Sequence, residues 1–84
     1  MINQIFSIRD TKANAYLTPF FMNNEAMAIR AITDLANDIE HSFCKHSEDY
    51  ALYSLGVYDD ATGKLEVLDA PLHVVNVVEL KSEE

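Results

Sequence analysis

The sequence predicts an α+β fold: a two-layer domain in β-β-α-β-β order, with one helix on an antiparallel sheet. Three observations lead to this prediction. Two segments rich in β-branched and aromatic residues precede a stretch in which apolar residues recur at helical spacing. Two more strand-like segments follow, and the sequence between them is typical of a hairpin turn. A helix and hairpins on one sheet form a two-layer domain.

The first two strands are predicted at residues 2–8 and 15–21, with a polar turn between them. Pro19 lies within the second of these strands. Because proline has no backbone N–H to donate, we expect this strand to lie at the edge of the sheet or to contain a bulge.

The helix is predicted from about Asn24 to Ile39. Asn23 or Asn24 is a suitable N-cap, and the carboxylate of Glu25 in the first turn interacts favourably with the helix dipole. The apolar residues at helical spacing are Ala28, Ile29, Ile32, Leu35, Ala36 and Ile39. The three that we expect to face the core are Ala28, Ile32 and Leu35.

A central strand is predicted after the helix. Residues 40–48 form a polar connection with one apolar anchor, Phe43, and residues 50–58 then alternate as a strand with apolar side chains on both faces. Successive side chains of a strand point to opposite faces. Tyr50, Leu52 and Tyr58 are therefore predicted to share a face, the one that a single helix leaves uncovered.

The C-terminal part of the chain is predicted to be a hairpin and a further strand. Residues 59–63 are typical of a turn in which Gly63 adopts a positive φ, and residues 64–68 return as the partner strand. After Pro71, residues 72–80 contain four valines, which predicts a fifth strand or a strand-like tail. The domain is thus placed at residues 1–80, and residues 81–84 are expected to form a frayed acidic tail.

The chain is short and acidic. Its 84 residues favour one domain, and a chain of this length buries only about 60% of its unfolded surface. We therefore expect a homo-oligomer. The expected form is a dimer that assembles through the sheet face or through the valine-rich C-terminal strand. Asp and Glu number 14 against 6 Lys and Arg, for a net charge of −8. This charge argues against tight nonspecific binding to nucleic acid and against an anionic membrane surface, and it favours basic partners.

Several functional classes find no support in the residues. Cys44 is the only cysteine, which excludes an internal disulfide and is typical of a reducing cytosol. No signal peptide and no apolar run of about 20 residues for a membrane span is found. His41, Cys44 and His46 match no zinc-site spacing, so neither a metal nor a cofactor is expected. No nucleophile, base and orienting group occur at a recognisable spacing, so we do not expect an enzyme.

A nucleic-acid site is a hypothesis that the residues leave open. Four tyrosines and four phenylalanines offer stacking platforms for single-stranded DNA. The candidate site residues are Tyr50 and Tyr58 for the bases, with Lys12, Arg30 and Lys45 for the phosphates. Arg9 and Lys64 would extend such a basic track. The alternative is that the aromatic residues build the core or an oligomer interface, and the small number of cations favours this alternative.

Several motifs occur in a fixed order along the chain. The longest is Lys45-His46-Ser47-Glu48-Asp49-Tyr50, which is followed by a turn with Gly56, Tyr58 and Asp59. The preceding ones are Asp10-Thr11-Lys12-Ala13, Tyr16, Pro19-Phe20, Ala28, Arg30 and Asn37-Asp38. In this order they resemble the small nonstructural protein of gokushoviruses, single-stranded DNA phages of the Microviridae. The resemblance extends from the first strand to Pro71, and Ser47 stands where the family usually has proline.

The resemblance implies a nonstructural phage protein, made in the cytoplasm of the infected bacterial host and absent from the mature virion. It implies an accessory role in viral genome replication or packaging, with single-stranded viral DNA as a partner. The alternative is an acidic protein–protein adaptor, which docks on a viral or host replication or capsid protein without touching DNA.

Overall fold

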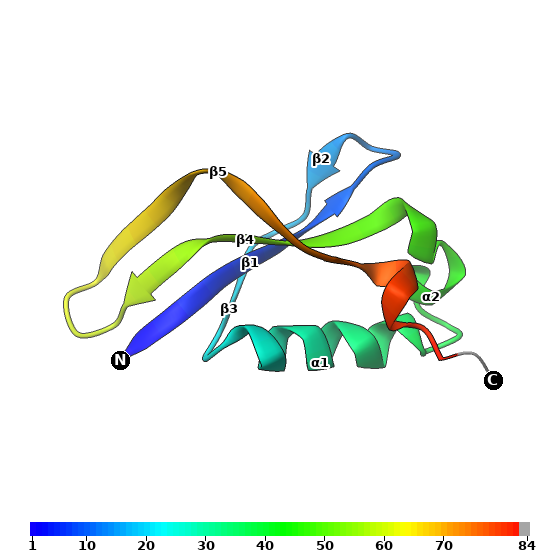
Figure 1. Cartoon of the computed structure of the whole chain (residues 1–84), viewed down its shortest axis with the longest axis horizontal. Helices are drawn as coiled ribbons and strands as arrows, with labels where there is room; N and C mark the ends of the chain where they lie inside the picture. Colours follow the sequence, from blue (N-terminus) through cyan, green and yellow to red (C-terminus); the bar gives the residue numbers. More distant parts are fainter. Residues whose placement is uncertain (83–84) are drawn as a thin grey trace.

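The computed structural model describes residues 1–82 and confirms the predicted α+β fold class (Figure 1). Within these residues, five strands form one antiparallel sheet and helix α1 lies against one of its faces. The elements in chain order are β1 (Ile2–Asp10), β2 (Ala15–Tyr16), β3 (Phe20–Met22), α1 (Glu25–Ala36), α2 (Ser42–Lys45), the 3-10 turn η1 (Ser47–Asp49), β4 (Tyr50–Asp59), β5 (Lys64–Asn76) and the 3-10 turn η2 (Val77–Leu80).

Strand β1 lies near the middle of the sheet, whose order is β2-β1-β4-β5. It pairs with β4 along one edge, and β2 and β3 share its other edge. Residues 15–21 therefore form two short strands instead of the one that the sequence predicts. The break covers residues 17–19 and includes Pro19, which has no backbone N–H to donate to the ladder. Leu17 N still donates to Ile8 O at 2.7 Å.

Helix α1 begins where the sequence predicts and ends earlier. Asn24 is the N-cap, and its side-chain oxygen accepts a hydrogen bond from Met27 N at 2.9 Å. The helix ends at Ala36, and Asn37 closes it by donating from its backbone N–H to Thr33 O at 3.2 Å. Ile39 is 75% exposed, so the predicted extension of the helix and of its apolar stripe to Ile39 is wrong.

The core lies between α1 and the central strands. Its buried residues are Phe6, Ile8, Ala28, Ile32, Ala36, Phe43, Leu52 and Val77. This confirms the inward positions of Ala28 and Ile32, while Leu35 is only partly buried and packs against the cluster. Phe43 is the buried anchor that the sequence predicts for the connection after the helix. That connection is more regular than expected, because it contains α2 and η1.

Strand β5 is one continuous strand of 13 residues. The predicted turn at residues 59–63 is confirmed: Gly63 has a φ of +75°, and its N–H donates to Asp59 O at 2.7 Å. Residues 72–76 are strand, as predicted, but they continue β5 and do not form a strand of their own. Residues 77–80 then form η2, with Val77 fully buried, so the valine-rich segment packs on the core.

The pairing of β4 with β5 is interrupted in the middle. Ser54 pairs with Leu72 and Gly56 pairs with Val67, so residues 68–71 of β5 arch away opposite a single residue of β4. The arch is visible in Figure 1 as the bend of β5 beside its label. It contains Pro71, which cannot donate a ladder hydrogen bond.

An irregularity at Leu55 reverses the faces of β4. Ser54 lies opposite Phe6 and Gly56 lies opposite Ile5, so Leu55 is an extra residue in β4. An extra residue shifts the alternation of side chains by one. Leu52 consequently lies in the core below the sheet, whereas Tyr58 lies on the opposite face. The prediction that Tyr50, Leu52 and Tyr58 share the uncovered face is therefore wrong.

The C-terminal residues of the described chain lie against α1 and α2. Lys81 Nζ donates to Cys44 O at 3.2 Å, and Ser82 N donates to Asn37 Oδ1 at 2.7 Å. Both residues are exposed, and Asn37 Nδ2 also donates to Leu80 O at 3.1 Å. Residues 83–84 of the predicted frayed tail lie outside the described residues.

Replacement of Ile32 by Asp should abolish cooperative unfolding. Ile32 is buried in the core, and an unpaired buried charge costs several kcal/mol, comparable with the total stability of about 5–15 kcal/mol of a small domain. Ile39→Asp introduces the same charge at an exposed position and should leave the thermal transition within a few degrees of wild type. Circular dichroism melts compare the two variants, and a folded Ile32→Asp variant with a wild-type transition would reject this core.

Replacement of Gly56 by Ala should separate β4 from β5. Gly56 has a φ of +153°, and a Cβ there would lie 2.2 Å from Glu66 O and 2.7 Å from Val67 Cα. Because both atoms belong to the backbone of β5, the strand itself must move, and we expect a loss of about 1–3 kcal/mol. Gly63→Asn is the control, since a Cβ at Gly63 has no neighbour within 4 Å and Asn tolerates positive φ. Equal urea midpoints for the two variants would contradict the close approach.

Candidate nucleic-acid interface

The sheet face opposite α1, which we call the open face, carries no acidic residue at its paired positions in residues 1–82. Phe6 and Ile8 point into the core, so their neighbours on β1 point to the open face. The pairing register then gives the open-face residues as Asn3, Ile5, Ser7, Arg9, Tyr16, Phe21, Ala51, Tyr53, Gly56, Tyr58, Leu65, Val67, His73 and Asn76. None of these positions holds an Asp or Glu, although the chain has 14 of them, and the Glu79 carboxylate on η2 accepts a hydrogen bond from the open-face residue Asn76 at 2.9 Å.

Three rings cross one end of the open face. Tyr16 on β2 and Tyr53 on β4 meet edge to face at 5.5 Å between ring centroids, and Tyr53 meets His73 on β5 at 5.4 Å. The Arg9 guanidinium lies 5.5 Å from the centroid of the Tyr16 ring and donates to Asn14 Oδ1 at 2.6 Å. We call Tyr16, Tyr53 and His73 the aromatic row. It has a cation at one end and spans the strands from β2 to β5.

The turn between β1 and β2 places Lys12 at the same end of the sheet. The Asp10 carboxylate accepts hydrogen bonds from Lys12 N at 3.0 Å and Ala13 N at 3.2 Å, and Asn14 adopts a φ of +55°. Thr11 donates to Asp49 O from its backbone N–H at 2.9 Å and from its hydroxyl at 3.0 Å. The turn is thus tied to η1.

The residues predicted from the sequence as a DNA site are not brought together. Lys12 lies on the turn that follows Arg9, Arg30 is exposed on α1 in the other layer, and Lys45 ends α2. Tyr50 lies on the helix side, with its ring 4.8 Å from the Phe43 ring. Tyr58 lies on the open face, but at the end away from the aromatic row.

The aromatic row was missed because no local signal reveals it. Tyr16 becomes a neighbour of Tyr53 only through the pairing of β1 with both β2 and β4. His73 reaches the same row because the residue before it pairs with Ser54 beyond the arch of β5. The rings come from three separate segments, and their register depends on bulges that composition does not indicate.

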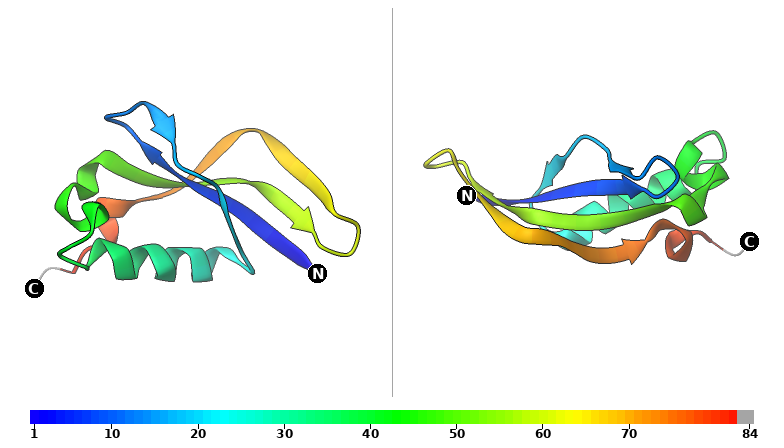
Figure 2. Two further views of the ribbon diagram at one scale, coloured as in Figure 1. Left: turned by 180° about the vertical axis from the view of Figure 1, so that it is seen from behind. Right: turned by 90° about the horizontal axis from the view of Figure 1, so that it is seen from above.

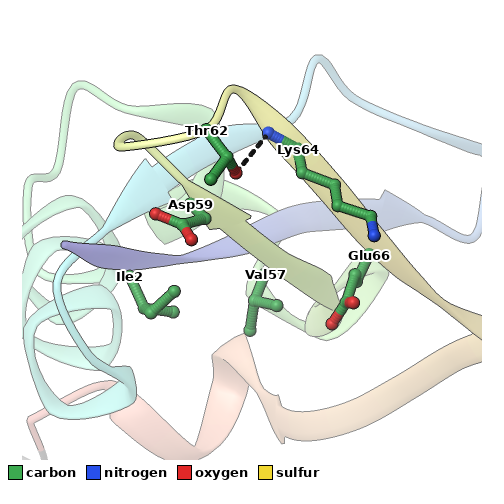
Figure 3. Close-up of a pocket in the computed structure, with 6 residues that line it drawn as sticks. All are labelled: Ile2, Val57, Asp59, Thr62, Lys64 and Glu66. Atoms are coloured by element: carbon green, nitrogen blue, oxygen red, sulfur yellow. Dashed lines mark hydrogen bonds between the residues drawn. The ribbon is translucent and has the colours of Figure 1, made fainter.

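A pocket on the helix side of the hairpin is lined by Ile2, Val57, Asp59, Thr62, Lys64 and Glu66 (Figure 3). Its cavity volume is about 100 Å³, smaller than the roughly 300–1,000 Å³ of typical ligand sites. Lys64 N donates to Thr62 Oγ1 at 3.3 Å across its rim. A pocket of this volume is too small for most ligands, so we do not treat it as the binding site.

Neither a metal site nor a membrane-spanning helix is found in residues 1–82. No group of three or more His, Cys, Asp or Glu side chains is placed to hold a metal ion in this part of the chain. His41, one of the three residues considered for zinc, instead caps α2 by accepting a hydrogen bond from Phe43 N at 3.0 Å. No helix among the described residues is long and apolar enough to cross a membrane.

Comparison with known proteins identifies one family. The family model described as Phage ORF5 protein matches residues 3–80. No curated protein and no solved structure matches the chain. The matched segment contains every strand after the first residue of β1, the helix α1 and the whole open face.

The N-terminal amine is held by the hairpin turn, and this contact should make stability depend on pH. Met1 N lies 2.7 Å from Asp60 Oδ1 and 4.0 Å from Asp59 Oδ1. The hydrogen bond to the Asp60 carboxylate raises the pKa of the amine above 8.0, against an opposing effect of desolvation. The pKa of the amine is therefore higher in the folded state than in the unfolded state. The contact stabilises the fold fully below about pH 8, and this stabilisation is lost as the pH rises through the folded-state pKa.

Asp60→Asn should therefore lower the melting temperature at pH 7 and have a smaller effect at pH 10.5. Asp69→Asn removes a carboxylate from β5 and serves as the control for the change in net charge. Melting curves of the three proteins at both pH values test the contact. A deficit of Asp60→Asn that is the same at both pH values, or matches that of Asp69→Asn, would argue against it.

Proposed function

Because the chain belongs to the Phage ORF5 protein family, we propose that it is a nonstructural phage protein that binds single-stranded DNA during viral genome replication or packaging. The motif order supports a gokushovirus of the Microviridae as its source. We place the protein in the cytoplasm of the infected bacterial host and outside the mature virion. It acts by binding, without a cofactor and without catalysis of its own.

The observation that carries the proposal is the segregation of charge. In a chain with a net charge of −8, the aromatic row lies on a sheet face without acidic residues at its paired positions in residues 1–82. The cations at this end are Arg9 on the open face and Lys12 on the adjoining turn. Two acids lie beside the row: Asp10 closes the same turn, and Glu79 accepts a hydrogen bond from Asn76 Nδ2 at 2.9 Å. Exposed rings next to cations, on a face without acids at its paired positions, are the combination that single-stranded nucleic acid requires.

Stacking supplies the main attraction in this proposal. Base stacking on an aromatic side chain contributes about 1–3 kcal/mol per base and tolerates any sequence, because every base has a π-face. Tyr16 is 41% exposed and Tyr53 is partly exposed, so both rings are available to bases. Sheet-based readers of single-stranded RNA use aromatic residues of their strands in the same way. Arg9 and Lys12 would meet the phosphates that flank the stacked bases.

The net negative charge limits the affinity without forbidding binding. Screening confines the field of distant acids to about 8 Å at physiological salt, so the acids of the other surfaces act weakly on the open face. Two phosphate contacts predict a shallow salt dependence, with a slope of log K against log salt of about −1.4. We therefore expect modest affinity that derives more from stacking than from counterion release.

An acidic adaptor is the second candidate, and a different surface favours it. Four exposed carboxylates follow one another around the end of α1 and the connection after it, at Asp34, Asp38, Glu40 and Glu48. Such a surface attracts basic proteins. In this role the protein would dock on a viral or host replication or capsid protein and leave DNA untouched.

Fluorescence anisotropy with a labelled single-stranded oligonucleotide tests the DNA proposal. Arg9→Glu should weaken binding strongly, whereas Arg30→Glu makes the same charge change on α1 and should have little effect. Tyr53→Ala should weaken binding about 5- to 150-fold, the equivalent of one lost stacking contact of about 1–3 kcal/mol. Tyr58→Ala removes the same side chain outside the aromatic row and is its control. Circular dichroism verifies that each variant is folded.

Three outcomes separate the candidates. Binding that depends on Arg9 and Tyr53, and that prefers single strands over a duplex, supports the proposed interface. Binding that is weakened equally by Arg30→Glu, Lys45→Glu and Tyr58→Ala would keep DNA as the ligand and reject the aromatic row as its site. Absence of wild-type binding even at low salt would remove DNA and leave the adaptor, whose basic partner is then sought by pull-down from infected cells.

A further inference from the structure

The hairpin end of the open face carries an apolar patch that is separate from the aromatic row. We define the patch as Phe21 on β3, Tyr58 on β4, and Leu65 and Val67 on β5. Phe21, Leu65 and Val67 are 49%, 55% and 71% exposed, and the Tyr58 ring lies 5.6 Å from the Phe21 ring. By register these residues surround Ile5 and Gly56, and no charged side chain lies among them.

The patch lies on a part of the molecule that no second layer covers. The β4–β5 hairpin extends beyond the N-terminal end of α1, as both views in Figure 2 show. The Cα radius of gyration is 13.3 Å, whereas a compact chain of this length would have about 12 Å. The accessible surface is 5500 Å², against about 5,000 Å² for a compact monomer of this mass.

We infer that this patch is the interface of a homodimer, in which the hairpins of two copies pack face to face about a two-fold axis. Each copy has a net charge of −8, so two copies repel each other over most of their surface. The patch offers a large apolar contact without that repulsion. An isologous contact places the same apolar side chains opposite one another, which requires no charge complementarity.

The excess surface agrees with a reversible dimer. A specific interface hides at least about 1,000 Å² in total, so each copy must bury about 500 Å² around the patch, which is no more than the amount by which the surface of the whole chain exceeds that of a compact monomer. We therefore expect a dissociation constant in the micromolar range. The patch contains no cation to meet a phosphate and no acid to meet a basic protein, so neither nucleic acid nor a basic partner matches it as well as a second copy does.

The dimer is independent of the proposed DNA site. The aromatic row of each copy lies at the other end of the open face, nearer to β2 and to the turn at Lys12. Pairing through the hairpins would leave both rows accessible and would present two DNA tracks in one particle.

Analytical ultracentrifugation from about 1 to 500 µM tests the interface with two glutamate variants. Val67→Glu places a charge in the patch, and each dimer would bring two such charges together, so we expect the dissociation constant to rise at least tenfold. Leu72→Glu makes the same change on the same strand at a residue that is 61% exposed, but Leu72 pairs with Ser54 on the helix side. We expect its dissociation constant to stay within twofold of wild type.

A monomeric wild type at 500 µM, or equal effects of the two glutamate variants, would overturn the proposed interface. Dimerisation that only Val67→Glu disrupts would establish it. Oligonucleotide anisotropy of Val67→Glu and of wild type is run in parallel over the same range of protein concentrations, and the two dissociation constants for DNA should be equal. DNA binding and dimerisation therefore succeed or fail separately in these measurements.

Discussion

The close approach of β5 to Gly56 is the contact on which the arrangement of the sheet depends. Glu66 O and Val67 Cα lie where a Cβ of residue 56 would be, so only glycine allows the two strands to pair at this point. Immediately before it, Leu55 is the extra residue that shifts the alternation of β4. Together these two residues bring Leu52 into the core and Tyr58 onto the open face, and they force residues 68–71 of β5 to arch away.

The aromatic residues are divided between the core side and the open face of the sheet. Tyr50 and Phe43 contact each other beside the core, and Phe6 and Phe20 stack at 5.9 Å within it. The aromatic row and the Phe21–Tyr58 pair lie on the other side of the sheet, where they do not contribute to the layer covered by α1. A protein of 84 residues with a small core thus keeps several large rings on its surface. The proposed DNA site and the proposed dimer interface both use these exposed rings.

The two polar motifs of the sequence are explained largely by structure. The segment around Asp10-Thr11-Lys12-Ala13 forms a turn closed by the Asp10 carboxylate, and the segment around Glu48-Asp49 forms η1. They meet where Thr11 donates twice to Asp49 O. This contact fixes the β1–β2 turn against the main body of the protein, and the position of Lys12 at the end of the open face follows from it. A motif that stabilises a turn can therefore also determine where a cation of the proposed DNA site lies.

The sequence by itself determined the features whose causes are local. The N-cap, the glycine of the hairpin turn and the apolar anchor depend on residues a few positions away. Gly63 and Phe43 were correctly predicted from their neighbours, and Asn24 was one of the two N-cap candidates. The tertiary structure alone decided the end of α1 and the faces of β4, whereas the break of the second strand includes Pro19, where the sequence already predicts an edge strand or a bulge. The end of α1 and the faces of β4 depend on contacts between distant segments, such as Asn37 with Leu80 and Gly56 with Val67. The aromatic row also depends on contacts between distant segments. Its three rings share a face only when β1, β2, β4 and β5 pair in the observed register, and a shift of one residue in a strand would place its ring on the other face.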